Sequence, residues 1–279
     1  LSRGLGDVYK RQMSDLRQTW EPMLGKYRPG TIYPDAVPFG ERWRMAATTP
    51  FWAGHNPRPE RFLASYPDKK ELIFYRAPNG NQYYNAQQHI GNYFNVVDLK
   101  FADLLVDSLK KFYASGGKVN DGWEQLSSGY IPVGQCDSEV PLPDMLNHPT
   151  VKAEQLITPA NIARGDEYSD IYGRFYQYLG NRLKQELPGK KLVILPYSSY
   201  TQAPLNPKWK LPDNIEMRVC FYGMDKIRDP EVAAKWKRLV HEWSQAQQGR
   251  PVASLSHGGW TKRRVACSSR QKGATRCAL

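Results

Sequence analysis

Apolar and polar positions along the chain follow two periods, and the change of period separates expected helices from expected strands. Apolar residues recur at helical spacing in residues 98–114, 168–187 and 230–246, so each segment is predicted to form an amphipathic helix. Asp98 precedes the first of these runs and is a residue type that caps helix N-termini. These three segments are the clearest predicted elements of the chain.

Short runs rich in apolar and β-branched residues predict strands. The run 191–196 (KLVILP) is almost continuously apolar, which is typical of a parallel strand buried on both faces. Pro132 weakens the prediction for its own segment because proline cannot donate to a ladder. The predicted strands are residues 41–51, 70–76, 129–136, 191–196, 214–222 and 251–255.

The order of these elements favours an α/β fold with a parallel sheet and helical crossovers. An open doubly wound sheet and a (β/α) barrel both fit this order. No G-x-G-x-x-G follows a predicted strand and no G-x-x-x-x-G-K-[ST] is present, so a dinucleotide or P-loop fold is disfavoured. No internal repeat is visible. We interpret residues 13–255 as an incomplete (β/α) TIM-like barrel.

Both ends of the chain differ in character from the middle. Residues 1–12 (LSRGLGDVYKRQ) resemble translated adapter sequence at the edges of metagenomic gene fragments, and residues 256–279 lack acids and periodicity. We expect both ends to be non-native. A disordered native leader and a basic tail that binds nucleic acid are the alternatives.

The net charge does not indicate a nucleic-acid partner. The total is +12, but residues 256–279 contribute +6 and residues 1–12 contribute +2, which leaves +4 for residues 13–255. A charge of that size is ordinary for a domain of this length. We therefore predict no nucleic-acid partner for the middle of the chain.

The sequence contains no motif for a metal site, a cofactor site or a membrane-spanning helix. The chain has four cysteines without a C-x-x-C spacing, and its five histidines show no metal-binding pattern. We predict no metal and no cofactor. No run approaches the ~20 apolar residues of a membrane helix, so no membrane insertion is expected. No G-x-S-x-G elbow is present, which disfavours an α/β-hydrolase.

The best candidates for catalysis follow the predicted strand 129–136. Functional residues in parallel barrels collect at the carboxyl ends of the strands. If the chain stays extended there, Asp137 and Glu139 point to one face with their Cα atoms ~6.6 Å apart. Glycosidases use two carboxyl groups at about this separation, one as acid and one as nucleophile or base. The alternative is a solvated acidic turn.

Three other strand ends carry candidate substrate-binding residues. The loop after residues 41–51 contains Trp52, which could stack on a sugar ring, and His55 and Asn56, which could bond to hydroxyls; a loop packed under a helix is the alternative. The remaining candidates are Tyr197 and Tyr200, which follow the strand 191–196, Tyr222, which ends the next strand, and Arg218, which lies inside it.

The tyrosines could line a pocket mouth or pack at its rim. Arg218 interrupts an otherwise apolar strand, and an inward arginine needs a partner. It could bind a carboxylate such as that of a uronic acid, or it could face outward and cover a helix.

The order of several segments resembles a bacterial family of unknown function, whose barrel is related to those of α-glucuronidases and β-hexosaminidases. Together the matching segments span roughly residues 24–255, and their order is more specific than any one of them. They are LGKYRPGTIYP at 24–34, the loop 52–56, residues 101–112, residues 131–137, residues 168–187 followed by KLVILPYSSYTQAP, and NIEMRVCFY at 214–222.

The resemblance implies a glycoside-hydrolase-like barrel that degrades a polysaccharide or glycosaminoglycan-like glycan, in a protein exported to the periplasm or beyond. The opening residues show no signal-peptide pattern. Asp137 matches the Asp of the family's Asn-Asp-Gly type sequence, whereas Cys136 and Ser138 depart from its Asn and Gly. Glu139 rests on the spacing argument alone.

The resemblance also implies a leading domain and final barrel strands that this sequence does not contain. We therefore expect a glycoside hydrolase acting on an oligosaccharide or polysaccharide. A non-catalytic carbohydrate-binding barrel is the alternative, because a fold does not by itself imply a function.

Overall fold

The computed structural model describes part of the chain, and all of that part belongs to one unit, Phe51–Leu279. For residues 221–222, 253–257 and 264–265 only the backbone is described. The predicted strand 41–51 lies outside the described residues. The described residues are 56–85, 91–124, 126, 129–135, 138–222, 229–250, 252–257 and 264–265.

The strands form one sheet whose order follows the chain, β1-β2-β3-β4-β5. Each of the first three strands pairs in parallel with its successor, whereas β4 and β5 pair in antiparallel fashion. This confirms the predicted α/β class with a parallel sheet, although the described strands do not close into a barrel. The strands are β1 Tyr130–Val133, β2 Lys191–Ile194, β3 Ile215–Tyr222, β4 Val252–His257 and β5 Arg264–Val265.

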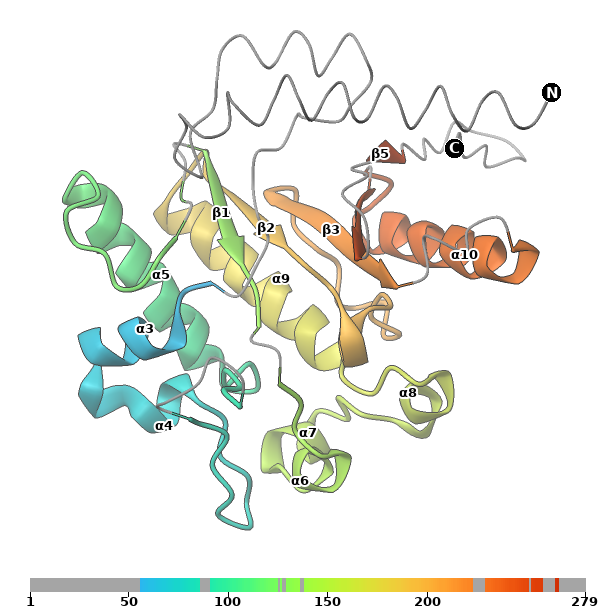
Figure 1. The fold of residues 1–279 in the computed structure, drawn as a ribbon, viewed down its shortest axis with the longest axis horizontal. Coiled ribbons are helices and arrows are strands. Elements are labelled where there is room, and N and C mark those ends of the chain that lie inside the picture. Colours follow the sequence, from blue (N-terminus) through green and yellow to red (C-terminus); the bar gives the residue numbers. More distant parts are fainter. Residues whose placement is uncertain are drawn as a thin grey trace, which may run out of the picture. The chain divides into compact units, whose positions relative to one another are not determined.

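The three predicted helices are confirmed with nearly the expected bounds. They are α5 (Leu99–Ala114), α9 (Ser169–Glu186) and α10 (Pro230–Ala246), labelled in Figure 1. The carboxylate of Asp98 accepts a hydrogen bond from the backbone N–H of Lys100, as the capping prediction required. No helix in the described ranges combines the length and the apolarity needed to span a bilayer.

Helix α9 is the centre of the packing, because α5 and the sheet both contact it. The rings of Phe101 on α5 and Phe175 on α9 stack with centroids 6.0 Å apart. On the sheet side, a Cβ at Gly180 would lie 2.8 Å from Cδ1 of Ile215 on β3. Glycine is therefore required where α9 meets the sheet so closely.

The connection between β2 and β3, residues 195–214, contains one short 3₁₀-helix, η2 (Ser198–Tyr200), and otherwise runs along α9 as an irregular segment. Pro204 in this segment lies so close to Gly173 that a Cβ there would be 2.4 Å from its Cγ. Farther along, Nη2 of Arg250 donates to the carbonyl oxygens of Leu211, at 3.0 Å, and Pro212, at 2.7 Å. The segment is thus fixed by side chains instead of by a helix of its own.

The prediction of a strand at residues 70–76 is wrong for its first half. Residues 70–73 form a helical turn, α4 (Lys70–Ile73), and only Phe74 and Arg76 make isolated bridges. Ile73 and Phe74 are both fully buried, so the helical turn satisfies the same apolar run that suggested a strand. Short apolar runs do not distinguish the two structures. Two further short helices precede α4, namely α3 (Pro59–Ser65) and η1 (Pro67–Lys69).

The connection from β1 to α9 contains three short helices that the periodicity did not predict. They are α6 (Leu142–Leu146), α7 (Pro149–Ala153) and α8 (Pro159–Arg164), and each has a proline in its first turn. Thr158 and Asn161 form a reciprocal capping box at the start of α8. Helices of one or two turns are too short to show a 3.6-residue period.

The outer edge of β1 is covered by Asn56. The backbone N–H of Lys191 donates to the carbonyl of Gly129. The backbone N–H and C=O groups of the odd-numbered residues of β1 therefore point toward β2, and those of the even-numbered residues point away from it. On that outer side the backbone of Gly134 pairs with the backbone of Asn56, and Pro132 has no N–H to leave exposed. The proline that weakened the strand prediction is therefore tolerated because β1 is paired with a strand on one side only in the described chain.

Candidate functional site

The two faces of the sheet differ in chemistry. Leu192, Ile194 and Ile215 are fully buried on the face that α9 covers. The alternate residues lie on the other face, where Nζ of Lys191 is 3.1 Å from Oε1 of Glu216 and 5.7 Å from the centroid of the Tyr130 ring. The hydrogen bond to Glu216 raises the pKa of Lys191. The face opposite the helix thus carries charged side chains beside the apolar Val193, which is fully buried.

Arg218 belongs to the same face as Lys191 and Glu216. It lies two residues after Glu216 on β3, opposite Ala253 of β4, and is only 7% exposed. Burial of a guanidinium in a sheet is costly unless acceptors surround it, so its position there is a specific feature of the fold. Its predicted role in binding a carboxylate stays a prediction.

At the carboxyl ends of the strands, groups that follow β1 and β2 meet. Glu139, exposed beyond the end of β1, accepts a hydrogen bond from the hydroxyl of Ser198, which follows β2. Ser198 has a φ of 54°, an uncommon value for a residue other than glycine, and its carbonyl accepts a hydrogen bond of 2.8 Å from the hydroxyl of Thr201. The predicted candidate Glu139 is therefore placed at the expected edge of the sheet.

Several predicted site residues lie outside the described part of the structure. Asp137, Trp52 and His55 are among the residues that are not described. Tyr222 ends β3, and only its backbone is described. The roles predicted for these residues stay predictions.

Asn56 is fixed at the outer edge of β1 by the hydrogen bonds of its side chain. It is 3% exposed, and its Nδ2 donates to the carbonyl of Pro132 at 2.6 Å and to that of Glu124 at 3.3 Å. Its Oδ1 accepts from the N–H of Glu124 at 2.9 Å. Both ends of the amide of Asn56 are therefore used within the protein.

Tyr197 and Tyr200 lie inside the protein, behind the strand ends. The hydroxyl of Tyr197 donates to the carbonyl of Gln135 at 3.1 Å. The ring of Tyr200 stacks on that of Tyr172, with centroids 3.6 Å apart and planes 12° apart. Burial raises the pKa of Tyr200 well above its usual value. Both tyrosines are thus buried and make their contacts within the protein.

The sequence analysis did not single out Gln135, which connects Phe94, Tyr172 and Tyr197 by hydrogen bonds. Its Nε2 donates to the hydroxyl of Tyr172 at 3.0 Å, and its Oε1 accepts from the N–H of Phe94 at 2.8 Å. The hydroxyl of Tyr172 in turn donates to that of Tyr93 at 3.0 Å. Gln135 and Tyr172 line a cavity of about 10 Å³, room for about one water molecule. The spacing of Tyr168, Tyr172 and Tyr176 along one helix is the signal that could have indicated this cluster.

The described residues offer no metal centre, since no group of three or more His, Cys, Asp or Glu side chains among them is arranged to hold an ion. What this edge of the sheet presents is an exposed carboxylate held by a hydroxyl, above a layer of buried tyrosines. Comparison of the chain with family models, curated proteins and solved structures finds no match.

Proposed function

We propose that this chain is part of a glycoside-hydrolase-like (β/α) barrel that binds a glycan at the carboxyl ends of its strands. The order β1-β2-β3-β4 supports the barrel, because each parallel strand lies beside its successor. A doubly wound sheet instead reverses its strand order at a switch point. The face that carries Lys191, Glu216 and Arg218 would then line the inside of the barrel.

The observation that carries the proposal is the meeting of Glu139 and Ser198 at consecutive strand ends. Parallel barrels bind their substrates at this edge. In the proposed reaction Glu139 and Asp137 act on the two sides of a glycosidic bond. One carboxyl protonates the leaving oxygen, and the other attacks the anomeric carbon or takes a proton from the attacking water. Ser198 holds the carboxylate of Glu139 in place.

The test is the release of reducing sugar from a panel of polysaccharides and aryl glycosides by the protein and by Asp137→Asn and Glu139→Gln variants. We expect each variant to lose at least about 100-fold in rate while it still binds the glycan. Glu60→Gln, a change of an exposed glutamate on α3, is the matched control and should keep full activity. Hydrolysis that persists in both variants would refute the proposed pair.

A second function, glycan binding without hydrolysis, is favoured by the exposure of Glu139. General acids of glycosidases lie in partly desolvated sites, whereas Glu139 is exposed. In that case the panel shows no hydrolysis, and calorimetry detects oligosaccharide binding that Glu139→Gln weakens. Absence of both hydrolysis and binding across the panel would refute both functions.

A further inference from the structure

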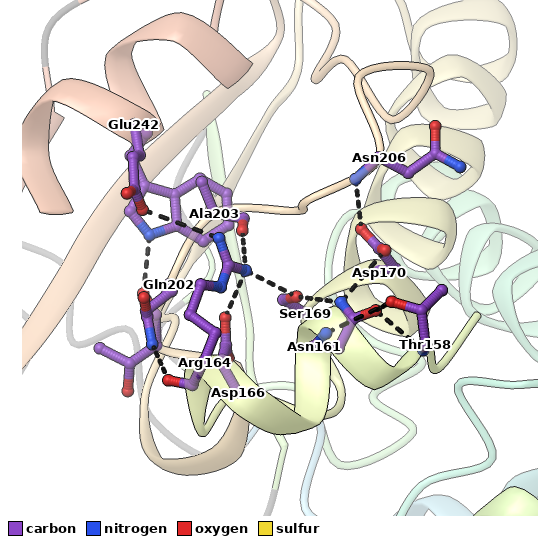
Figure 2. Close-up of polar contacts among 12 residues, drawn as sticks. Thr158, Asn161, Arg164, Asp166, Ser169, Asp170, Gln202, Ala203, Asn206 and Glu242 are labelled. Atoms are coloured by element: carbon purple, nitrogen blue, oxygen red, sulfur yellow. Dashed lines mark hydrogen bonds and ion pairs between the residues drawn. The ribbon is translucent and has the colours of Figure 1, made fainter. Parts of the chain in front are cut away.

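Arg164, the last residue of α8, is the centre of a partly buried polar cluster beside the start of α9. Its Nη2 lies 2.7 Å from Oδ2 of Asp166, 3.0 Å from Oγ of Ser169 and 2.6 Å from the carbonyl oxygen of Ala203. Its Nη1 lies 3.9 Å from Oε2 of Glu242 on α10. Figure 2 shows the guanidinium pointing between these groups, which come from three separate segments.

The cluster holds the connection that follows β2. Besides the bond to Ala203, the side chain of Gln202 donates to the carbonyl of Arg164 at 3.2 Å. The indole of Trp243 on α10 donates to the carbonyl of Thr201 at 2.7 Å. The connection has no long helix of its own, so these bonds decide where residues 199–203 lie. Ser198, the partner of Glu139, directly precedes them.

The charges of the cluster do not balance. One guanidinium faces two carboxylates, those of Asp166 and Glu242, while the connection at residues 197–206 contains no charged residue. Asp166 is 1% exposed, and its Oδ1 has no hydrogen-bond partner in the described structure; the same holds for Oε2 of Glu242 and for Nε of Arg164. Binding of one proton by Asp166 would neutralise the excess negative charge. It would also lower the free-energy cost of burying Oδ1 of Asp166 without a hydrogen bond.

A third carboxylate, that of Asp170, lies nearby but has its own partners. Its Oδ2 accepts from Nδ2 of Asn161 at 3.2 Å, and its Oδ1 accepts from the N–H of Asn206 at 3.0 Å. It therefore does not compete for Arg164. Burial raises the pKa of Asp166 to about 8, although Arg164, the hydroxyl of Ser169 and the backbone N–H of Gln202 in the connection act in the opposite direction.

We propose that the Arg164 cluster is a proton-dependent latch, in which a proton held by Asp166 keeps residues 199–206 closed against the start of α9. In the open state Asp166 is in water and releases that proton to the solvent. Because the closed state binds the proton more tightly than the open state, a rise in pH favours opening. This inference does not rest on the proposed hydrolysis.

The direct test is amide hydrogen exchange, corrected for the intrinsic exchange rate, on the peptide that covers residues 197–206. For a single proton we expect the opening constant to rise by up to about tenfold per pH unit between pH 5 and pH 8. In Asp166→Asn, which resembles the protonated acid, the constant should stay low and independent of pH. Peptides from α5 serve as the internal control and should show no such change.

Two outcomes would overturn the latch. One is a connection whose opening does not depend on pH in the unaltered protein, and the other is an equal dependence in Asp166→Asn. If that variant fails to fold, ¹³C NMR titration of the Asp166 carboxyl in the unaltered protein decides the matter. A midpoint below pH 5 would exclude the latch, and a midpoint near pH 8 that coincides with the change in exchange would support it.

Discussion

Nδ2 of Asn56 lies 2.6 Å from the carbonyl oxygen of Pro132, so one side chain from a distant segment covers the outer edge of β1. The backbone of the same residue pairs with Gly134, through bonds of 3.1 and 3.3 Å. Edge strands offer unpaired backbone groups to other chains, and this arrangement removes most of them. Asn56 is thus a determinant of where the described sheet ends on this side.

Asn56→Asp should destabilise the protein by about 2–3 kcal/mol, because the carbonyls of Pro132 and Glu124 would face a carboxylate instead of a donor. The free energy of unfolding, measured with urea, checks this expectation. Asn181→Asp, at an exposed position of α9, is the matched control and should change the free energy by no more than about 0.5 kcal/mol. A similar effect of the two variants would contradict the assigned role of Asn56.

Gly180→Ala should destabilise the protein by about 1–3 kcal/mol, although alanine is the better helix former. The new methyl group would lie 2.6 Å from Cγ of Pro212 and 2.8 Å from Cδ1 of Ile215, so α9 would have to move away from the sheet. Thermal unfolding of this variant and of the exposed neighbour variant Asn181→Ala gives the comparison. A gain of stability in Gly180→Ala would show that the contact can relax.

The stability of the protein should depend on pH through Asp166. Its pKa is raised to about 8 in the folded protein and is about 4 in an unfolded chain. Between these values only the folded state retains the proton, so the free energy of unfolding falls as pH rises, by up to about 1.4 kcal/mol per unit. The contribution is fully present below pH 4 and is lost by pH 8.

Asp166→Asn should lack this fall. Urea unfolding of both proteins from pH 4.5 to pH 8.5 measures the difference between their free energies. We expect the variant to become more stable relative to the unaltered protein as pH rises. Parallel profiles would mean that Asp166 does not bind a proton in this range.

Asp121→Ala should destabilise the protein by about 3 kcal/mol, because its Oδ2 accepts from the hydroxyls of Tyr66, at 2.6 Å, and Ser108, at 2.7 Å. Burial and the nearby carboxylate together raise the pKa of Tyr66, so the variant should also lower it. Spectrophotometric titration of tyrosine and urea unfolding check the two effects. Asp107→Ala, at an exposed position on α5, should leave the free energy of unfolding nearly unchanged.

The long helices and most strands could be predicted from the sequence because their patterns are local. In α5 the apolar residues Leu105 and Leu109 recur at one side of the helix, and both are buried as that spacing requires. The run KLVILP likewise contains a strand whose central residues are buried on both faces. Residues 70–73 show the limit of this reasoning, because four residues can bury their apolar side chains in a helical turn or in a strand.

The candidate site could be predicted only in part. Glu139 follows β1 in sequence, and its place at the edge of the sheet follows from the rule for parallel strands. Its contact with Ser198 joins residues far apart in the chain, which no local pattern indicates. The burial of Tyr197 and Tyr200 has the same origin, since Gln135 and Tyr172 decide where those rings pack.

The sequence by itself determined the class of the fold, the positions of its long elements and the acidic segment after β1, because hydrophobic periodicity and capping act over a few neighbouring residues. Only the tertiary structure decided that Asn56 closes the edge of β1 and that Arg164 joins α8, α10 and the connection after β2. Those roles depend on hydrogen bonds and charges between segments far apart in the chain. Such contacts form only once packing has brought the segments together.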